Sequence, residues 1–204
     1  MKLSILGLAA IGFCIVSTGS VVRAQTVLLE DNFDAENNGI PTINFFNFQN
    51  WTIEDGSVDL IGNGLYDYVP GNGLYLDLDG STGNAVRLVS SNLFSFDVGD
   101  TINLSFDLLG KNSANNNVEV SLGSLFSETF TDNDAGTTIL RTFEVISSAN
   151  EVALIFDHAG GDNGGLFLDN VRLAVDVPEP SSTIALLGLA AFGLRKAARD
   201  RKNR

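Results

Sequence analysis

The segment Thr101-Ile-Asn-Leu-Ser-Phe-Asp-Leu108 alternates polar and apolar residues, and its apolar positions are Ile102, Leu104, Phe106 and Leu108. Successive side chains of a β-strand point to opposite faces of a sheet, so this alternation predicts a strand with one buried face. Residues 25–176 contain no stretch with a sustained helical period. The segment therefore indicates that this part of the chain folds as β-sheet.

Further short segments show the same strand-like pattern, separated by clusters of glycine, asparagine and aspartate. They are 27–33, 57–61, 74–78, 85–89, 118–122, 124–130, 139–145, 151–156 and 166–175. About ten short strands with turn signals between them are typical of an antiparallel β-sandwich of the jelly-roll type. A barrel is the less favoured alternative, and a β-solenoid would need repeats that this sequence lacks. The predicted fold class is all-β.

The N-terminus has the features of a secretory signal. Lys2 supplies a positive charge, residues 3–16 are apolar apart from Ser4, and Val22-Arg23-Ala24 fits the small-residue cleavage rule. We expect a signal peptide over residues 1–24, forming a helix ahead of the sandwich. A permanent membrane helix is disfavoured because the apolar run is short. The only cysteine, Cys14, lies in this segment, so the mature chain has no thiol for a disulfide or a zinc site.

The C-terminus has three parts in order: Val177-Pro178-Glu179-Pro180, an apolar run over residues 184–194, and a basic tail. The basic residues of that tail are Arg195, Lys196, Arg199, Arg201, Lys202 and Arg204. The prolines break the preceding strand, and the apolar run predicts a short helix. Eleven residues at about 1.5 Å each reach roughly 17 Å, short of a hydrocarbon layer of about 30 Å. The basic charge predicts that the tail stays cytoplasmic while the domain faces outward. The alternative interpretation, in which the apolar run is a core helix of the soluble domain, is disfavoured by the basic tail that follows it.

This C-terminal arrangement over residues 177–204 resembles the PEP-CTERM protein-sorting signal. The resemblance implies recognition by an exosortase-type processing protease, with the Pro-Glu-Pro segment as the recognition element. It also implies transient anchoring in the inner membrane through the C-terminal helix. The resemblance further implies that the protein then passes to the cell envelope or the extracellular polysaccharide matrix. Residues 25–176 form the domain that is exported.

The domain is strongly acidic. Residues 25–177 contain 23 acidic and four basic side chains, a net charge of −19, whereas the whole chain has a net charge of −13. Such a surface repels nucleic acid and anionic membranes. The composition therefore excludes a nucleic acid partner and suits cations, neutral glycans or an ionic extracellular medium.

The order of motifs in the domain resembles exported galactose-binding-like jelly rolls, a group rich in carbohydrate-binding modules. The resemblance rests on segments 29–34, 50–52, 56–61, 75–80 and 168–173. Each segment is moderately specific, so the resemblance implies the fold more than a function.

A calcium site is predicted where the first and last strands end. Asp169 shares parity with Phe167 and Val171, and Asp31 with Leu29, so unbroken strands point both carboxylates to the apolar side. Burying an unpaired carboxylate costs several kcal/mol, which a shared calcium ion offsets. The resembled jelly rolls also imply such an ion, and Asp34 adds a further ligand. The alternatives are bulges that turn the aspartates outward, or backbone amides that satisfy them.

Tyr66 and Tyr68 form the candidate glycan-binding platform. They lie in the glycine-rich segment 64–71 with Asp67 between them as a possible hydroxyl acceptor. Two tyrosine rings on one face can stack on the apolar face of a sugar. The alternative is packing over the edge of the sandwich. Trp51 and the phenylalanines are expected in the core.

No catalytic arrangement is apparent. His158, the only histidine, is expected to be a solvated loop residue, and the single Gly160-Gly-Asp-Asn-Gly-Gly165 segment a flexible hairpin loop. The sequence predicts a non-enzymatic envelope or matrix protein that binds glycan or assembles within exopolysaccharide. The alternatives are a carbohydrate-active enzyme (glycosidase or lyase) on the same fold and a purely structural surface protein.

Overall fold

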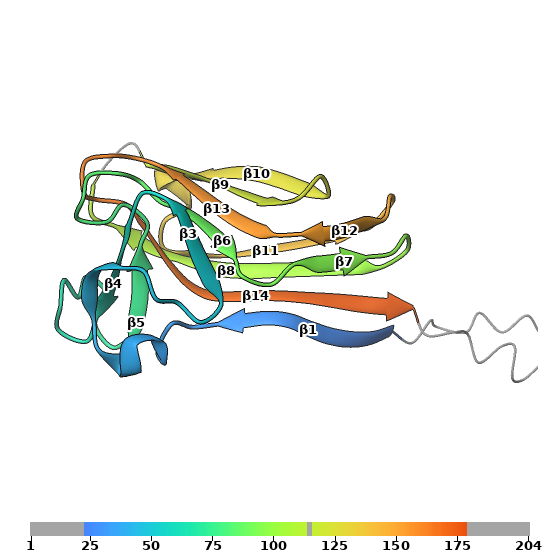
Figure 1. Ribbon diagram of the computed structural model, residues 1–204, viewed down its shortest axis with the longest axis horizontal. Coiled ribbons are helices and arrows are strands. Elements are labelled where there is room, and N and C mark those ends of the chain that lie inside the picture. Colours follow the sequence, from blue (N-terminus) through green and yellow to red (C-terminus); the bar gives the residue numbers. More distant parts are fainter. Residues whose placement is uncertain (1–22, 114–115, 179–204) are drawn as a thin grey trace, which may run out of the picture. The chain divides into compact units, whose positions relative to one another are not determined.

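The computed structural model describes residues 23–113 and 116–178, and this part of the chain is almost entirely β-structure (Figure 1). Residues 1–22 of the predicted signal peptide, the predicted C-terminal helix and residues 179–204 of the sorting tail lie outside the described ranges, whereas Arg23 and Ala24 begin a strand. Within those ranges, no helix is long and apolar enough to cross a membrane.

The larger of the sheets has seven strands, and the long strand β14 is at its centre. Six strands of this sheet lie in the order β11 (Thr137–Glu144), β8 (Thr101–Lys111), β14 (Leu166–Pro178), β5 (Leu74–Asp77), β4 (Val58–Gly62) and β2 (Thr42–Phe45), and the seventh, β1 (Arg23–Asp31), pairs with β14. β8 pairs with one edge of β14. The other edge pairs first with β5 and then with β1, which places the first and last strands side by side.

The facing sheet has five strands in the order β10 (Phe126–Thr131), β9 (Asn117–Leu122), β13 (Leu154–Ala159), β6 (Arg87–Ser90) and β3 (Trp51–Asp55). A third sheet pairs β12 (Ala149–Val152) with β7 (Phe94–Phe96). The short 3₁₀ helices are η1 (Glu36–Gly39) and η2 (Asp132–Asp134). All strand pairs in the described residues are antiparallel, which confirms the predicted all-β antiparallel sandwich.

The described residues form fourteen strands rather than about ten. β2, β3 and β7 were not predicted, and the predicted strand 151–156 is divided between β12 and β13. Residues 35–50, for which no strand was predicted, contain η1 and β2. Each of these strands has three to six residues, which explains why a period-two pattern is hard to recognise in them.

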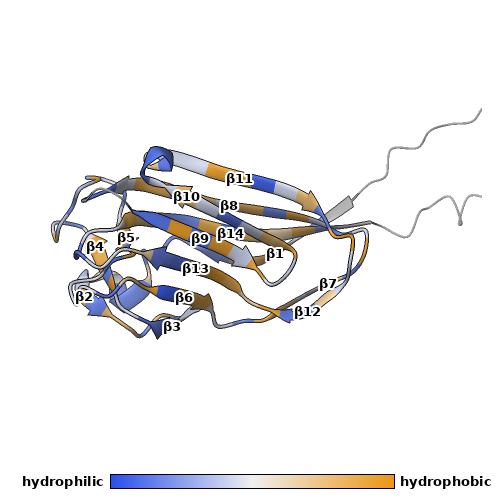
Figure 2. Ribbon diagram, turned by 90° about the horizontal axis from the view of Figure 1, so that it is seen from above, coloured by the Kyte–Doolittle hydropathy of each residue, from blue (hydrophilic) through white to orange (hydrophobic). Residues whose placement is uncertain are grey.

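The core lies between the two large sheets, and hydrophobic and hydrophilic residues alternate along their strands (Figure 2). In β8 the predicted face of Ile102, Leu104, Phe106 and Leu108 is fully buried. Phe106 makes edge-to-face contacts with Phe130 of β10 and Phe156 of β13, at centroid distances of 5.3 and 5.2 Å. The aromatic rings therefore join the two sheets, and Trp51, 2% exposed, is in the core as predicted.

β14 contains an irregularity that reverses which way its side chains point. Its pairing with β8 shifts between Asp169 and Arg172, and Asn170 has a positive φ of 49°. Leu168 and Val171 both face the core, so Asp169 is on the outer face of the seven-stranded sheet. The predicted orientation of Asp169 toward the core is therefore wrong, because the strand is not unbroken. Asp169 is nevertheless only 2% exposed.

A second, small hydrophobic cluster lies on the outer face of the same sheet. It consists of Ile61 of β4, Tyr75 of β5 and Phe167 of β14, with Val69 and Leu109 packed against it. Val69 belongs to residues 63–73, which connect β4 to β5. This connection, called the tyrosine loop below, therefore packs on the sheet rather than extending into solvent.

Candidate functional site

The two predicted tyrosines line one pocket. The cavity has a volume of about 250 Å³, and we call it the tyrosine pocket. Its wall includes the exposed rings of Tyr66 and Tyr68, which keep 57% and 53% of their surface accessible. The remaining lining residues are Asp59, Ile61, Asp77, Ser81, Asn112 and Asn163. Aromatic rings beside convergent hydrogen-bonding groups form a typical small-ligand site.

The tyrosine loop is made of turns, and a buried hydroxyl organises it. Tyr66 has a positive φ of 44°, so the tyrosines do not lie on an extended strand. The hydroxyl of Tyr75, whose ring is fully buried, accepts hydrogen bonds from the backbone N–H groups of Tyr68 and Val69 at 2.7 and 3.0 Å. It also donates a hydrogen bond to the Asp67 carboxylate at 3.5 Å, so that carboxylate already has a partner within the protein.

Packing fixes the ring of Tyr68. It stacks on Phe167 with a centroid distance of 5.2 Å and an interplanar angle of 20°. Phe167 in turn contacts Tyr75 at 5.5 Å. Because the ring is held and still half exposed, little rotamer entropy would be lost when a ligand stacks on it.

Two of the three predicted metal ligands anchor the end of the tyrosine loop. Asp34 accepts a hydrogen bond from the backbone of Leu74 at 2.8 Å, and Asp169 accepts one from the side chain of Asn72 at 2.6 Å. A Cβ atom on Gly73, whose φ is 87°, would lie 2.1 Å from Asp34, so the contact requires glycine. Burial raises the pKa of Asp169 to about 7.

Asp59 and Asp77 form a carboxylate pair in the wall of the pocket. They are directly opposite each other on β4 and β5, and their exposed fractions are 5% and 3%. Asp59 accepts hydrogen bonds from the backbone N–H groups of Asn44 and Ser81 and from the Ser81 hydroxyl. Like charges directly opposite each other in a sheet are destabilising, so this pair is a candidate functional feature.

Asp77 is held by three donors and still has an elevated pKa. Its carboxylate accepts hydrogen bonds from the backbone of Asp79 and Gly165 and from the side chain of Asn112. Burial raises the pKa of Asp77 to about 7, with a further upward contribution from Asp59, while the hydrogen bonds oppose the rise. The group therefore changes charge near neutral pH.

The glycine-rich segment 160–165 is anchored and is not a hairpin. It connects β13 of one sheet to β14 of the other. Asp79, which is fully buried, accepts hydrogen bonds from the backbone of Gly161 and Asp162, and Asp77 accepts one from Gly165. These bonds hold Asn163 at the pocket wall.

His158 is buried, with 4% of its surface exposed, so the prediction of a solvated histidine is wrong. It lies within β13, and its Nε2 accepts a long hydrogen bond of 3.4 Å from the backbone of Leu166. Burial lowers the pKa of His158 to about 4, so the ring is neutral at physiological pH.

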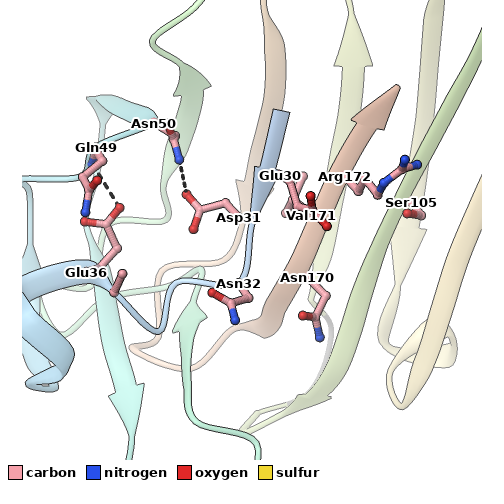
Figure 3. Close-up of a pocket in the computed structure, with 11 residues that line it drawn as sticks. Glu30, Asp31, Asn32, Glu36, Gln49, Asn50, Ser105, Asn170, Val171 and Arg172 are labelled. Atoms are coloured by element: carbon pink, nitrogen blue, oxygen red, sulfur yellow. Dashed lines mark hydrogen bonds between the residues drawn. The ribbon is translucent and has the colours of Figure 1, made fainter. Parts of the chain in front are cut away.

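A second, larger pocket of about 580 Å³ lies where β1 and the bulge of β14 meet (Figure 3). Asp31, half-buried, accepts hydrogen bonds there from the side chains of Asn50 and Trp51, both at 3.0 Å. Glu36, 2% exposed, accepts one from the backbone of Gln49 at 3.0 Å. Burial raises the pKa of Glu36. The side chains lining this pocket include no aromatic ring.

The three predicted calcium ligands do not share one place. Asp31 lines the second pocket, whereas Asp34 and Asp169 hold the tyrosine loop. Asp31 and Asp169 both have hydrogen-bond donors, Phe33 backbone N–H for Asp31 and Asn170 backbone N–H for Asp169. In residues 23–113 and 116–178, no group of three acidic, histidine or cysteine side chains is arranged to hold a metal ion. Calcium stays a prediction.

Sequence reasoning found the tyrosines of the pocket but missed its polar wall. Asp59 and Asp77 lie in two consecutive predicted strands. Consecutive strands often pair with each other, and this pairing is the feature that could have brought the two residues together. Ser81, Asn112 and Asn163 come from three separate loops, and only the tertiary structure brings them together.

Comparison with known proteins identifies one sequence motif. The PEP-CTERM protein-sorting motif matches residues 176–202, which confirms the prediction for the C-terminus. The motif belongs to proteins that are sorted after export. No curated protein matches the chain.

The solved structures that the fold resembles include carbohydrate-binding modules. A family 29 carbohydrate-binding module is 14% identical, with a TM-score of 0.38, over 76% of this chain and 90% of that one. The CBM22-1 xylan-binding domain from Paenibacillus barcinonensis is 14% identical, with a TM-score of 0.32, over 76% and 97% of the two chains. At these TM-scores the likeness assigns neither residues nor ligand to this chain.

Proposed function

We propose that this chain is a cell-envelope or extracellular-matrix protein whose sandwich binds polysaccharide in the tyrosine pocket. The proposal rests mainly on one observation: two half-exposed tyrosine rings share a pocket with carboxylate, amide and hydroxyl groups. Rings offer a flat surface to the C–H face of a sugar, and the polar groups match its hydroxyls. The larger pocket has the polar groups without the rings.

The C-terminal motif gives the proposed destination of this binding domain. The apolar run over residues 184–194 and the basic tail hold the chain transiently at the inner membrane. An exosortase-type protease processes the chain, and the sandwich reaches the envelope or the extracellular polysaccharide. The domain's net charge of −19 over residues 25–177 supports a partner other than nucleic acid or an anionic membrane.

A second candidate function is glycoside cleavage, and the carboxylate pair of Asp59 and Asp77 is the observation that favours it. Glycosidases use two carboxyl groups, one of which has a raised pKa and serves as the acid. Asp77, whose burial raises its pKa to about 7, would be that acid. The half-exposed rings of Tyr66 and Tyr68 serve binding and have no part in this chemistry, so binding is the preferred function.

Retention on immobilised polysaccharides tests the proposal. We expect the full-length protein to be retained on at least one of xylan, glucomannan, chitosan and chitin. Replacing both rings (Tyr66→Ala with Tyr68→Ala) is expected to weaken the affinity by about tenfold or more, at least about 1.4 kcal/mol. Phe46→Ala removes a 54%-exposed ring outside the pocket and serves as the matched control.

The outcomes separate the three candidate functions. Equal retention of the wild type and the double variant contradicts a tyrosine-dependent site. Absence of retention on all four polysaccharides favours a structural surface protein. New reducing ends in the same incubations, lost in Asp77→Asn, favour the hydrolase.

A further inference from the structure

The wall of the tyrosine pocket holds two carboxyl groups and no side chain with a positive charge. Asp59 and Asp77 line it from adjacent strands, and its eight lining residues include no lysine or arginine. The inference below rests on the proposed function, because it concerns which sugars this pocket accepts.

Each carboxylate keeps capacity for one more donor. A carboxylate offers about four acceptor sites, and Asp59 and Asp77 each use three of them in the hydrogen bonds described above. Hydrogen bonds between a cationic donor and a carboxylate are short and roughly twice as strong as neutral ones. An ammonium group in the pocket would find two such acceptors side by side.

The rest of the domain does not reverse this field. Of its four basic residues in 25–177, Arg87 pairs with Glu54 and Asp157, Lys111 with Asp132, and Arg141 with Glu128.

The fourth basic residue, Arg172, lines the other pocket and donates a hydrogen bond to Gln25. An anionic sugar at the tyrosine pocket thus meets only unfavourable charge, whereas a cationic sugar is attracted.

We propose that the tyrosine pocket selects sugars that carry a free ammonium group, such as deacetylated amino sugars, over their N-acetylated forms and over uronic acids. The tyrosine rings bind the C–H face that all these sugars share. The ammonium group pairs with Asp59 and Asp77. Acetylation removes the positive charge of the ammonium group. A uronate brings a negative charge, which the carboxylates of the pocket repel.

Titration calorimetry of the full-length protein tests this selection with three probes of equal length: hexamers of glucosamine, N-acetylglucosamine and galacturonate. We expect the glucosamine hexamer to bind about tenfold or more tighter than its acetylated form at low ionic strength, and the galacturonate hexamer to show no binding. Added salt is expected to reduce the preference, because screening weakens the charge pairing.

Two variants locate the selectivity. Asp77→Asn keeps an acceptor for the backbone N–H groups and removes the charge, and we expect the ratio of the two affinities to fall toward one. Glu144→Gln removes an exposed charge on β11, outside the pocket, and is expected to leave the ratio unchanged.

The acidic surface attracts any cationic oligomer, so an undiminished affinity of the Tyr66→Ala and Tyr68→Ala double variant for the glucosamine hexamer overturns the inference. So does tyrosine-dependent binding in which the acetylated hexamer is equal or tighter, a result that leaves the proposed function standing. If the tyrosine substitutions alter the binding of no hexamer and no neutral polysaccharide, the proposed function itself fails.

Discussion

Replacing Phe106 with alanine is expected to destabilise the domain by about 3–5 kcal/mol. The ring is fully buried at the centre of β8 and contacts Phe130 and Phe156 of the facing sheet edge-to-face. Its removal leaves a cavity between the sheets and ends both aromatic contacts. A domain of this kind has a total stability of about 5–15 kcal/mol, so the substitution removes a large fraction of it.

Urea unfolding of the variant and the wild type measures this cost. Leu140→Ala, which truncates a 63%-exposed side chain on β11, is the control and is expected to change the stability by about 0.5 kcal/mol or less. A Phe106→Ala variant as stable as this control would show that the rings do not hold the two sheets together.

The free energy of unfolding of Asp77→Asn, relative to that of the wild type, is expected to be higher at about pH 8 than at about pH 4. The expected difference between the two pH values is roughly 2–4 kcal/mol. Burial raises the pKa of Asp77 to about 7 from an ordinary value of 3.8. Between these values the folded state keeps a proton that the unfolded state has lost. The stability from this group is therefore complete below the unfolded pKa and is lost as the pH rises through the folded pKa. Asparagine is neutral throughout and lacks this loss.

Other buried groups also make the stability of the wild type depend on pH. Their contributions are the same in the variant, so they cancel when the two proteins are compared. Burial raises the pKa of Asp169 to about 7, so the contribution of this residue to stability is lost over the same pH range as the pH rises. His158, with a pKa lowered to about 4, acts oppositely, because its contribution is lost as the pH falls from 6.5 to about 4. Leu140→Ala, which removes no titrating group, is the control, and its effect on stability is expected to be the same at the two pH values. An Asp77→Asn variant that loses as much stability at about pH 8 as at about pH 4 contradicts the raised pKa.

The long strands were predictable because burial on one face imposes a period of two. β8, β9 and β11 follow their predicted segments closely, and β14 extends its own. The short strands β2 and β7 have too few residues to show a period, and only their partners define them as strands.

The site was predictable only as far as it depends on local sequence. Tyr66 and Tyr68 are exposed because a glycine-rich loop holds them, which the sequence indicates. The bulge that turns Asp169 outward and the sheet crossover that buries His158 depend on strand pairing. A single sequence does not specify the register of strand pairing, so the position of Asp59 opposite Asp77 was not predicted.

Amide hydrogen–deuterium exchange of the full-length protein, with and without glucomannan or the glucosamine hexamer, tests most directly where polysaccharide binds. The tyrosine pocket predicts that a bound saccharide slows exchange in the tyrosine loop, residues 63–73, and in the anchored segment 160–165. Slower exchange confined to residues 30–36 and 49–50, at the wall of the larger pocket, would contradict that assignment.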